Sequence, residues 1–274
     1  MGRIRSLAGI REAACAGGLL LALALAACGG GESAGTEGAA AGASLSPQPA
    51  ATAEDAAPLP LESFHYAATL TVRGRDTAPG DELVISTDGD FQAPGRHAFS
   101  YVMRRGDGDA ISRSVVVIQQ DAWLRSGDDP WRQVDRADPT LTDVLRHAFS
   151  ALRPDFLGGA EFDQVRQVAA RLPSDAQLVN GVAANHFQAD STSSEFFQAL
   201  LSEDVLAGDS GNVRWELWLA ADGEWPVRLL VSRDNVDGSP LLDDLDLPPP
   251  ISWELRVDVS RPNDPTLRVA APDS

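Results

Sequence analysis

The side chains that most often carry chemistry are scattered along this chain without a catalytic spacing. The four histidines are isolated from one another and include no pair four residues apart: His65, His97, His147 and His186. The sequence contains no H-E-x-x-H and no glycine-rich phosphate loop. We therefore expect surface or strand-edge histidines, no catalytic residue, no metal site, no cofactor and no enzymatic activity.

Two short acidic sequences resemble fragments of calcium-binding loops. Asp88-Gly89-Asp90 and Asp107-Gly108-Asp109 each place two carboxylates around a glycine. Neither continues into the alternating ligands and distal glutamate that a calcium loop requires. The same residues are typical of hairpin turns, which need no ion. We predict turns at both places, and a solvated loop at residues 243–246.

The thiol of Cys28 is the one reactive group whose surroundings indicate a specific chemistry. It ends an apolar stretch over residues 17–27, which follows a basic N-terminus and is too short to cross a ~30 Å hydrocarbon core. The sequence Leu25-Ala26-Ala27-Cys28 resembles the lipobox of bacterial lipoproteins, whose cysteine carries a diacylglyceryl group after cleavage before it. An ordinary secretion signal and a short anchor helix are the alternatives.

The lipobox resemblance implies a signal peptide at residues 1–27 and lipidation at Cys28. The protein would then be extracytoplasmic and lipid-anchored to the membrane of a bacterial envelope. Buried acyl chains contribute ~0.8 kcal/mol per methylene, so two or three chains hold a protein durably. Cys15 would leave with the signal peptide, and the mature chain would contain no thiol for a disulfide or a metal site.

The charge of the chain excludes one large class of partner. Cleavage at Cys28 removes three of the 22 basic residues and one of the 40 acidic residues, so the net charge changes from −18 to about −20. Such a surface repels phosphate backbones, and we expect no nucleic-acid binding. All the cations are arginines.

The composition divides the mature chain into two parts. Residues 28–60 are mainly Gly, Ala, Ser, Pro, Thr and Glu, which predicts a flexible, lipid-anchored tether. Residues 61–274 have enough apolar side chains for one domain with a hydrophobic core.

Alternation of apolar and polar residues predicts strands at both ends of this domain. In the first half, strands joined by short Gly- and Asp-rich turns form a meander; they are expected at residues 64–72, 81–92, 96–104, 111–120, 122–125 and 131–134. Strand character returns at residues 176–190, around Asn180-Gly181. Further strands are expected at residues 213–219, 225–233, 251–259 and 266–270.

Two amphipathic helices are expected between these strands. Asp138 can cap the first, whose apolar stripe is Leu141, Val144, Leu145, Ala148 and Phe149. The second begins near Thr192, ends at Gly208 and has an apolar face that includes Phe196, Phe197 and Leu200. Residues 161–172 fit a helix moderately and a strand poorly. The order predicts an α+β fold, with helices on one face of an antiparallel sheet.

Several short segments together resemble one family. They are Leu178-Val179-Asn180-Gly181-Val182, the hairpin from Trp215 to Arg228 with Asp222-Gly223 at its turn, and the closing Arg261-Pro262-Asn263-Asp264-Pro265. This combination resembles the LppX/LprA/LprG group of lipoproteins, which is similar to the lipoprotein carrier LolA and the regulatory protein RseB. The spacing between Gly223 and Pro226 departs slightly from the pattern of that group.

The resemblance covers about residues 61–272 and implies an unclosed antiparallel β half-barrel with helices covering the concave face. Members of the group bind acyl chains of lipids or lipoproteins in an apolar cavity between sheet and helices. The resemblance therefore implies a carrier, with these residues of the two helices as candidates for the cavity wall: Leu145, Phe149, Phe196, Phe197 and Leu200. The same side chains would equally fill an ordinary core. An envelope sensor or interaction module with a protein partner is the alternative function.

Overall fold

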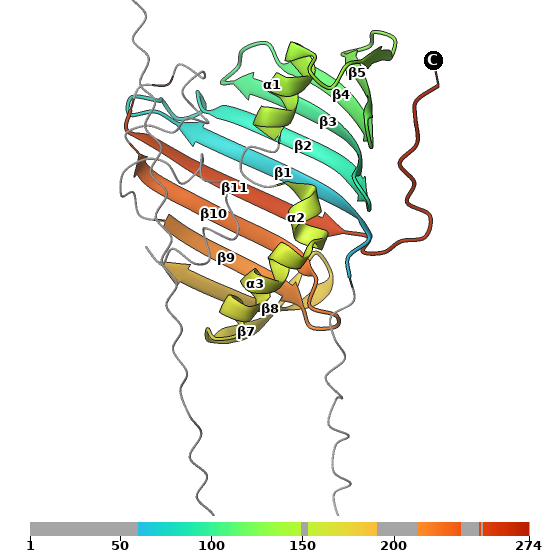
Figure 1. Ribbon diagram of the computed structural model, residues 1–274. Helices are drawn as coiled ribbons and strands as arrows, with labels where there is room; N and C mark the ends of the chain where they lie inside the picture. The colour runs from blue at the N-terminus through green and yellow to red at the C-terminus, as the bar shows by residue number, and fades with distance from the viewer. Residues whose placement is uncertain (1–59, 149–152, 191–212, 237–246, 248, 274) are drawn as a thin grey trace, which may run out of the picture. The chain divides into compact units, whose positions relative to one another are not determined.

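The computed structural model describes residues 60–148, 153–190, 213–236, 247 and 249–273 of the chain. These residues belong to one compact unit, Glu54–Ser274. Eleven strands form a single antiparallel sheet, whose order is β6-β5-β4-β3-β2-β1-β11-β10-β9-β8-β7. The edge strands β6 and β7 do not pair with each other, so the sheet is open (Figure 1).

The strands lie close to the positions that alternation predicts. Those of the first half are β1 (Ser63–Arg73), β2 (Leu83–Gln92), β3 (Arg96–Arg105), β4 (Ile111–Ile118), β5 (Asp121–Ser126) and β6 (Arg132–Val134). Those of the second half are β7 (Ser174–Val179), β8 (Val182–Asp190), β9 (Val213–Ala220), β10 (Pro226–Val236) and β11 (Ile251–Ser260). The last strand, β11, pairs with the first, β1, and this pairing joins the two halves of the chain into one sheet.

Three helices lie on one face of the sheet: α1 (Pro139–Ala148), α2 (Pro154–Gly158) and α3 (Ala160–Ala169) (Figure 1). The predicted cap of α1 is present, because Asp138 Oδ1 accepts the backbone N–H groups of Thr140 at 2.9 Å and Leu141 at 3.2 Å. The predicted fold class, an antiparallel half-barrel with helices on one face, is confirmed. The second predicted helix, residues 192–208, lies outside the described residues.

Strict alternation gives the sheet two different faces. The face toward the helices, which we call the inner face, carries Phe64, Tyr66, Leu70 and Val72 of β1, all at most 5% exposed. The opposite, outer face carries His65, Thr69 and Arg73 of the same strand. The register continues both faces from strand to strand; Phe64 pairs with Phe91 of β2, for example.

Residues 161–172, which fit a helix better than a strand, are mainly helix α3, because Phe162, Val165 and Ala169 form a buried stripe at helical spacing. Two other local predictions were wrong. Asp88-Gly89-Asp90 is no turn but lies within β2, where Gly89 faces the inner layer. Residues 266–270 form no strand; Leu267 and Val269 instead pack against Val116 on the outer face.

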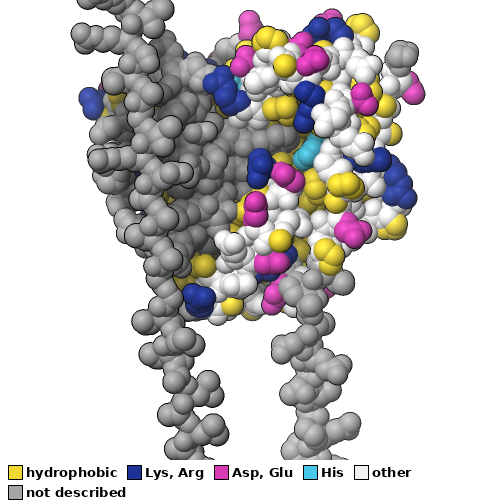
Figure 2. All heavy atoms as spheres, viewed as in Figure 1, with side chains coloured by type: hydrophobic (Ala, Val, Ile, Leu, Met, Phe, Trp, Pro, Cys, Tyr) yellow, Lys and Arg dark blue, Asp and Glu magenta, His cyan; other side chains and the backbone are white. Residues whose placement is uncertain are grey.

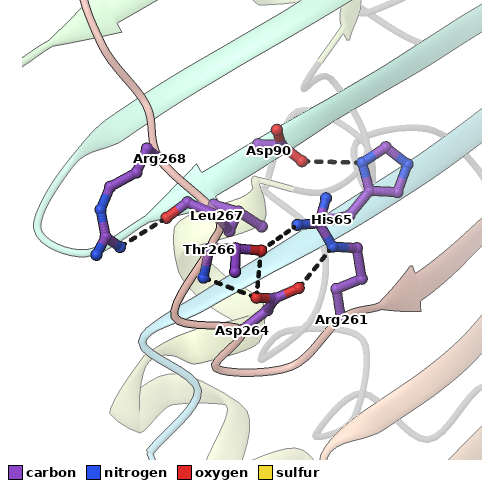
Figure 3. A network of polar contacts seen from close by, with 7 residues as sticks. All are labelled: His65, Asp90, Arg261, Asp264, Thr266, Leu267 and Arg268. Atoms are coloured by element: carbon purple, nitrogen blue, oxygen red, sulfur yellow. Dashed lines mark hydrogen bonds and ion pairs between the residues drawn. The ribbon is translucent and has the colours of Figure 1, made fainter.

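The chain after β11 is fixed by polar contacts around Asp264 (Figure 3). Arg261 Nε donates to Asp264 Oδ2 at 2.9 Å, and the backbone N–H of Thr266 donates to Asp264 Oδ1 at 2.7 Å. The hydroxyl and N–H of Thr266, followed by Arg261, lower the pKa of Asp264 to about 2. Asn263, in the same turn, accepts the N–H groups of Glu62 at 2.7 Å and Ser63 at 3.2 Å. This turn therefore ties the C-terminal segment to the beginning of β1.

Among the helices that the structure describes, none has the length and apolar character that crossing a membrane requires.

We predict that Gly89→Ala lowers the free energy of unfolding by about 1–3 kcal/mol, because it overpacks the inner layer. A Cβ at Gly89 would lie 2.4 Å from Cβ of Phe99 and 2.6 Å from the carbonyl oxygen of Ala98. Urea unfolding measures the change. Ser86→Ala, on the outer face of the same strand, is the control and should change stability by less than about 0.5 kcal/mol. Equal stability of the two variants would contradict this packing.

Candidate ligand-binding face

An apolar layer covers most of the inner face of the sheet. It extends from Leu124 of β5 to Phe187 of β8 and forms one buried cluster with residues of the helices. The central strands supply its largest side chains, among them Phe64, Phe99, Trp215 and Trp253. The sheet thus presents a broad apolar wall, of the kind that lines sites for hydrophobic ligands.

The three helices contribute a second set of apolar side chains to this layer. Each helix contributes buried apolar residues: Leu141 and Val144 of α1, Phe156 and Leu157 of α2, and Phe162 and Val165 of α3. The rings of Phe156 and Phe162 meet edge to face, with centroids 5.9 Å apart. Gly158 permits close approach of α2, because a Cβ there would lie 2.4 Å from the carbonyl oxygen of Leu61.

Seen from the helix side, the described surface mixes acidic, basic and apolar side chains, and no large area has one sign of charge (Figure 2). The polar groups of the inner layer lie below this surface. Burial raises the pKa of Tyr101 to about 12 and lowers the pKa of His97. Burial, together with the negative charges of Asp90 and Asp88, raises the pKa of Tyr66 well above its usual value. These groups are therefore neutral near pH 7 and suit an apolar environment.

Arg233 of β10 is the exception, since it is a cation on the inner face. It pairs with Trp253 of β11 on one side and Val213 of β9 on the other. The residue is 5% exposed, and burial lowers its pKa from the usual value. The sequence carried a signal for it, because Leu229, Val231 and Arg233 occupy alternate positions on one face of the strand.

Only one predicted cavity residue lies within the described residues. Leu145 of α1 is partly buried and packs against the inner cluster. Its role toward a ligand stays a prediction. The other four, Phe149, Phe196, Phe197 and Leu200, lie outside the described residues, so their proximity to the inner face also stays a prediction. Cys28 lies outside the described residues as well, and its lipidation stays a prediction.

The outer face carries a polar network that sequence reasoning missed. His186 of β8 is 7% exposed, which corrects its assignment as a surface or strand-edge histidine. Its ring stacks on Trp218 of β9, with centroids 4.4 Å apart and planes at 14°. Nε2 lies 3.1 Å from Oε2 of Glu216, and Nδ1 lies 3.0 Å from Oδ1 of Asp175. Asn180-Gly181 turns the chain between β7 and β8, and this hairpin packs Val179 against the outer face.

The network continues across the sheet to Asp258 of β11. Its two carboxylate oxygens accept from Nε of Arg228 at 2.6 Å and Nε of Arg256 at 2.7 Å, and Asn180 Nδ2 donates to it at 3.0 Å. Burial raises the pKa of Asp258, but the hydrogen bonds from Arg256, Asn180 and Arg228 outweigh this effect and lower it overall. No spacing in the sequence reveals this network, because its members come from five strands and a turn.

Searches of known proteins give matches of low identity in solved structures. No family model and no curated protein matches the chain. LprF from Mycobacterium bovis is 13% identical, with coverage of 78% of this chain and 90% of that chain and a TM-score of 0.41. A DUF1329 family protein from Desulfovibrio piger is 10% identical, with coverage of 76% and 88% and a TM-score of 0.24.

A third match is a putative outer membrane lipoprotein-sorting protein domain from Vibrio parahaemolyticus. It is 9% identical, with coverage of 76% of this chain and 88% of that chain and a TM-score of 0.23. By their names, the first and third matches are of the kind of protein that the sequence motifs resemble. At these identities and scores, they say nothing about the ligand of this chain.

We predict that Asp258→Asn lowers the free energy of unfolding at pH 7 by about 1–2 kcal/mol, because it weakens charge-assisted hydrogen bonds. The native pKa of Asp258 is below the unfolded value, so its contribution is complete above about pH 4 and is lost as the pH falls through the native pKa. Urea unfolding at pH 7 and pH 3 measures both effects. Asp128→Asn, in the exposed turn after β5, is the control. A deficit of Asp258→Asn that is equally large at both pH values would contradict the assignment.

Proposed function

We propose that this chain is a lipid-anchored extracytoplasmic protein that binds the acyl chains of lipids or lipoproteins, as a carrier. The observation that carries the proposal is the continuous apolar layer between an open sheet and separate short helices. The lipobox-like sequence at Cys28 supports the membrane anchor. The alternative, an envelope sensor that binds a protein partner, would use the same layer without lipid transfer.

The binding mechanism requires an acyl chain to enter the layer between helices and sheet. Each methylene that leaves water contributes ~0.8 kcal/mol, so one long chain suffices for useful affinity. The helices are short: α1 and α3 have ten residues each and α2 has five. Helices of this length are marginal in isolation and depend on packing, so a ligand can replace some of their contacts with the sheet at modest cost. The sheet, held by ladder hydrogen bonds, remains the fixed wall.

We predict that Cys28→Ser transfers the protein from the membrane fraction to the soluble fraction of its native host, because the acyl anchor is lost. Western blotting after ultracentrifugation, with [³H]palmitate labelling, measures this change. Cys15→Ser, inside the proposed signal peptide, is the control and should leave both membrane association and labelling unchanged. A Cys28→Ser protein that stays in the membrane fraction would count against lipid anchoring.

We predict that the chain from residue 28 onward, with serine at position 28, binds phospholipid at a defined stoichiometry in native mass spectrometry. Leu145→Gln should lower the bound fraction several-fold, because it places an amide in the apolar layer. Leu178→Gln is the matched control. Leu178 is 76% exposed at the β7 edge, so its substitution should leave the bound fraction unchanged. Circular dichroism checks that both variants fold.

Wild-type protein that carries no lipid after purification, and takes none up from phospholipid vesicles, would overturn the carrier proposal. A protein partner that copurifies in place of lipid would then favour the sensor alternative. Equal lipid occupancy of the two leucine variants would remove Leu145 from the ligand site without affecting the proposal itself.

A further inference from the structure

Arg233 places a positive charge inside the apolar layer of the inner face. Among the residues that the structure describes, no other arginine or carboxylate is as fully buried. Its cross-strand neighbours are Trp253 and Val213, and the residues before it on the same face, Val231 and Leu229, are at most 1% exposed. A guanidinium stays charged in proteins, so Arg233 keeps a positive charge at this position.

The chemistry of the guanidinium indicates what kind of ligand group it can bind. It has five N–H donors in a planar fork that matches the oxygens of a carboxylate or a phosphate. A contact with one group of the protein leaves further donors for a second acceptor. Arg233 can therefore hold an internal partner and still bind the acid group of a ligand.

The position of Arg233 along the strand relates this charge to the apolar wall. It is the last inner-face residue of β10 before the register shift that precedes Val236. From there the apolar stripe continues through Val231 to Leu229, a length of about 13 Å at the usual rise of a strand. Leu255 and Val257 of β11 pair with these two residues and widen the stripe. A ligand with an acid group at one end and an acyl chain at the other matches this arrangement.

We propose that Arg233 binds the acid group of an anionic amphiphile, a carboxylate or a phosphate, whose acyl chain lies along the inner faces of β10 and β11. The inference rests on the proposed function and specifies its ligand class. Arg233 thereby determines the preference for anionic over neutral ligands, and the acyl chain supplies most of the affinity.

The test compares two ligands that differ only in the acid group, dodecanoate and dodecanol. The protein is the chain from residue 28 onward with serine at position 28, and the readout is the dissociation constant at pH 7.5. Wild-type protein should bind dodecanoate at least tenfold more tightly than dodecanol. Arg233→Met should weaken dodecanoate binding at least tenfold and leave dodecanol binding within twofold.

Three further arms make the result specific. Arg104→Met, which removes an exposed arginine from the outer face of β3, should change neither constant. Arg233→Lys keeps the charge but not the fork, and should retain part of the preference for dodecanoate. Monododecyl phosphate, tested beside dodecanoate, distinguishes a phospholipid headgroup from a free fatty acid as the source of the acid group.

Equal affinity of wild-type protein for dodecanoate and dodecanol, or equal loss of both in Arg233→Met, would overturn the inference about Arg233 and leave the carrier function intact. Failure of wild-type protein to bind either ligand would overturn the carrier function itself. If circular dichroism shows that Arg233→Met does not fold, the wild-type ratio and the Arg233→Lys constants decide the outcome.

Discussion

The open edge of the sheet is the constraint on which the rest of this structure depends. Eleven strands pair in one row, and the end strands β6 and β7 do not meet. A closed barrel would cover its own interior, but this sheet leaves a broad apolar face that water would otherwise contact. The face must be covered by other parts of the chain. The helices α1, α2 and α3 do so, and most of their buried side chains are large and apolar.

The two faces of the sheet are held by different kinds of interaction. On the outer face, directional contacts dominate: Asp258 accepts from Arg228 and Arg256, and His186 stacks on Trp218 between two carboxylates. On the inner face, contact between apolar side chains dominates, and it has little directional preference. A polar network holds one arrangement, whereas apolar contacts can be exchanged for others of similar area. For the proposed function, this difference indicates that a hydrophobic ligand would enter from the helix side, where contacts can be exchanged, and that the sheet would be the fixed wall.

Alternation and capping were sufficient to predict most of the architecture. The burial of Phe64, Tyr66, Leu70 and Val72 follows from period two, and the start of α1 follows from Asp138. The pairing of β11 with β1 does not follow from local pattern, because it joins residues almost 200 positions apart. Residues 266–270 alternate as a strand does, yet Leu267 and Val269 satisfy that pattern by packing on Val116. Alternation indicates that an extended segment buries one side, but it does not indicate that the segment pairs with a neighbouring strand.

The candidate site was less accessible to sequence reasoning than the fold. Leu145 could be assigned to an apolar stripe, but a stripe of this kind fits an ordinary core as well as a ligand site. Glycine in Asp88-Gly89-Asp90 suggested a turn, whereas the structure uses it to bring Phe99 close to β2. Arg233 was detectable in principle, since it continues the alternation of Leu229 and Val231. Its position within an apolar layer depends on the cross-strand neighbours Trp253 and Val213, and only the strand register identifies these neighbours.

The strongly acidic composition gives a buried arginine more importance than its single charge suggests. A net charge of −18 disfavours the approach of anions over the surface as a whole. That repulsion is screened within about 10 Å at moderate ionic strength, and it acts through water. Inside the apolar layer, a guanidinium interacts with an anion in a medium of lower polarity, where the attraction is several times stronger. The acidic surface therefore disfavours the approach of an anionic amphiphile, whereas the guanidinium in the interior favours its binding. The interior dominates once the acyl chain is buried, because burial of the chain brings the acid group beyond the reach of screening ions. An acidic surface with an internal cation thus fits the proposed preference, in which soluble anions are rejected and an anion attached to an acyl chain is accepted.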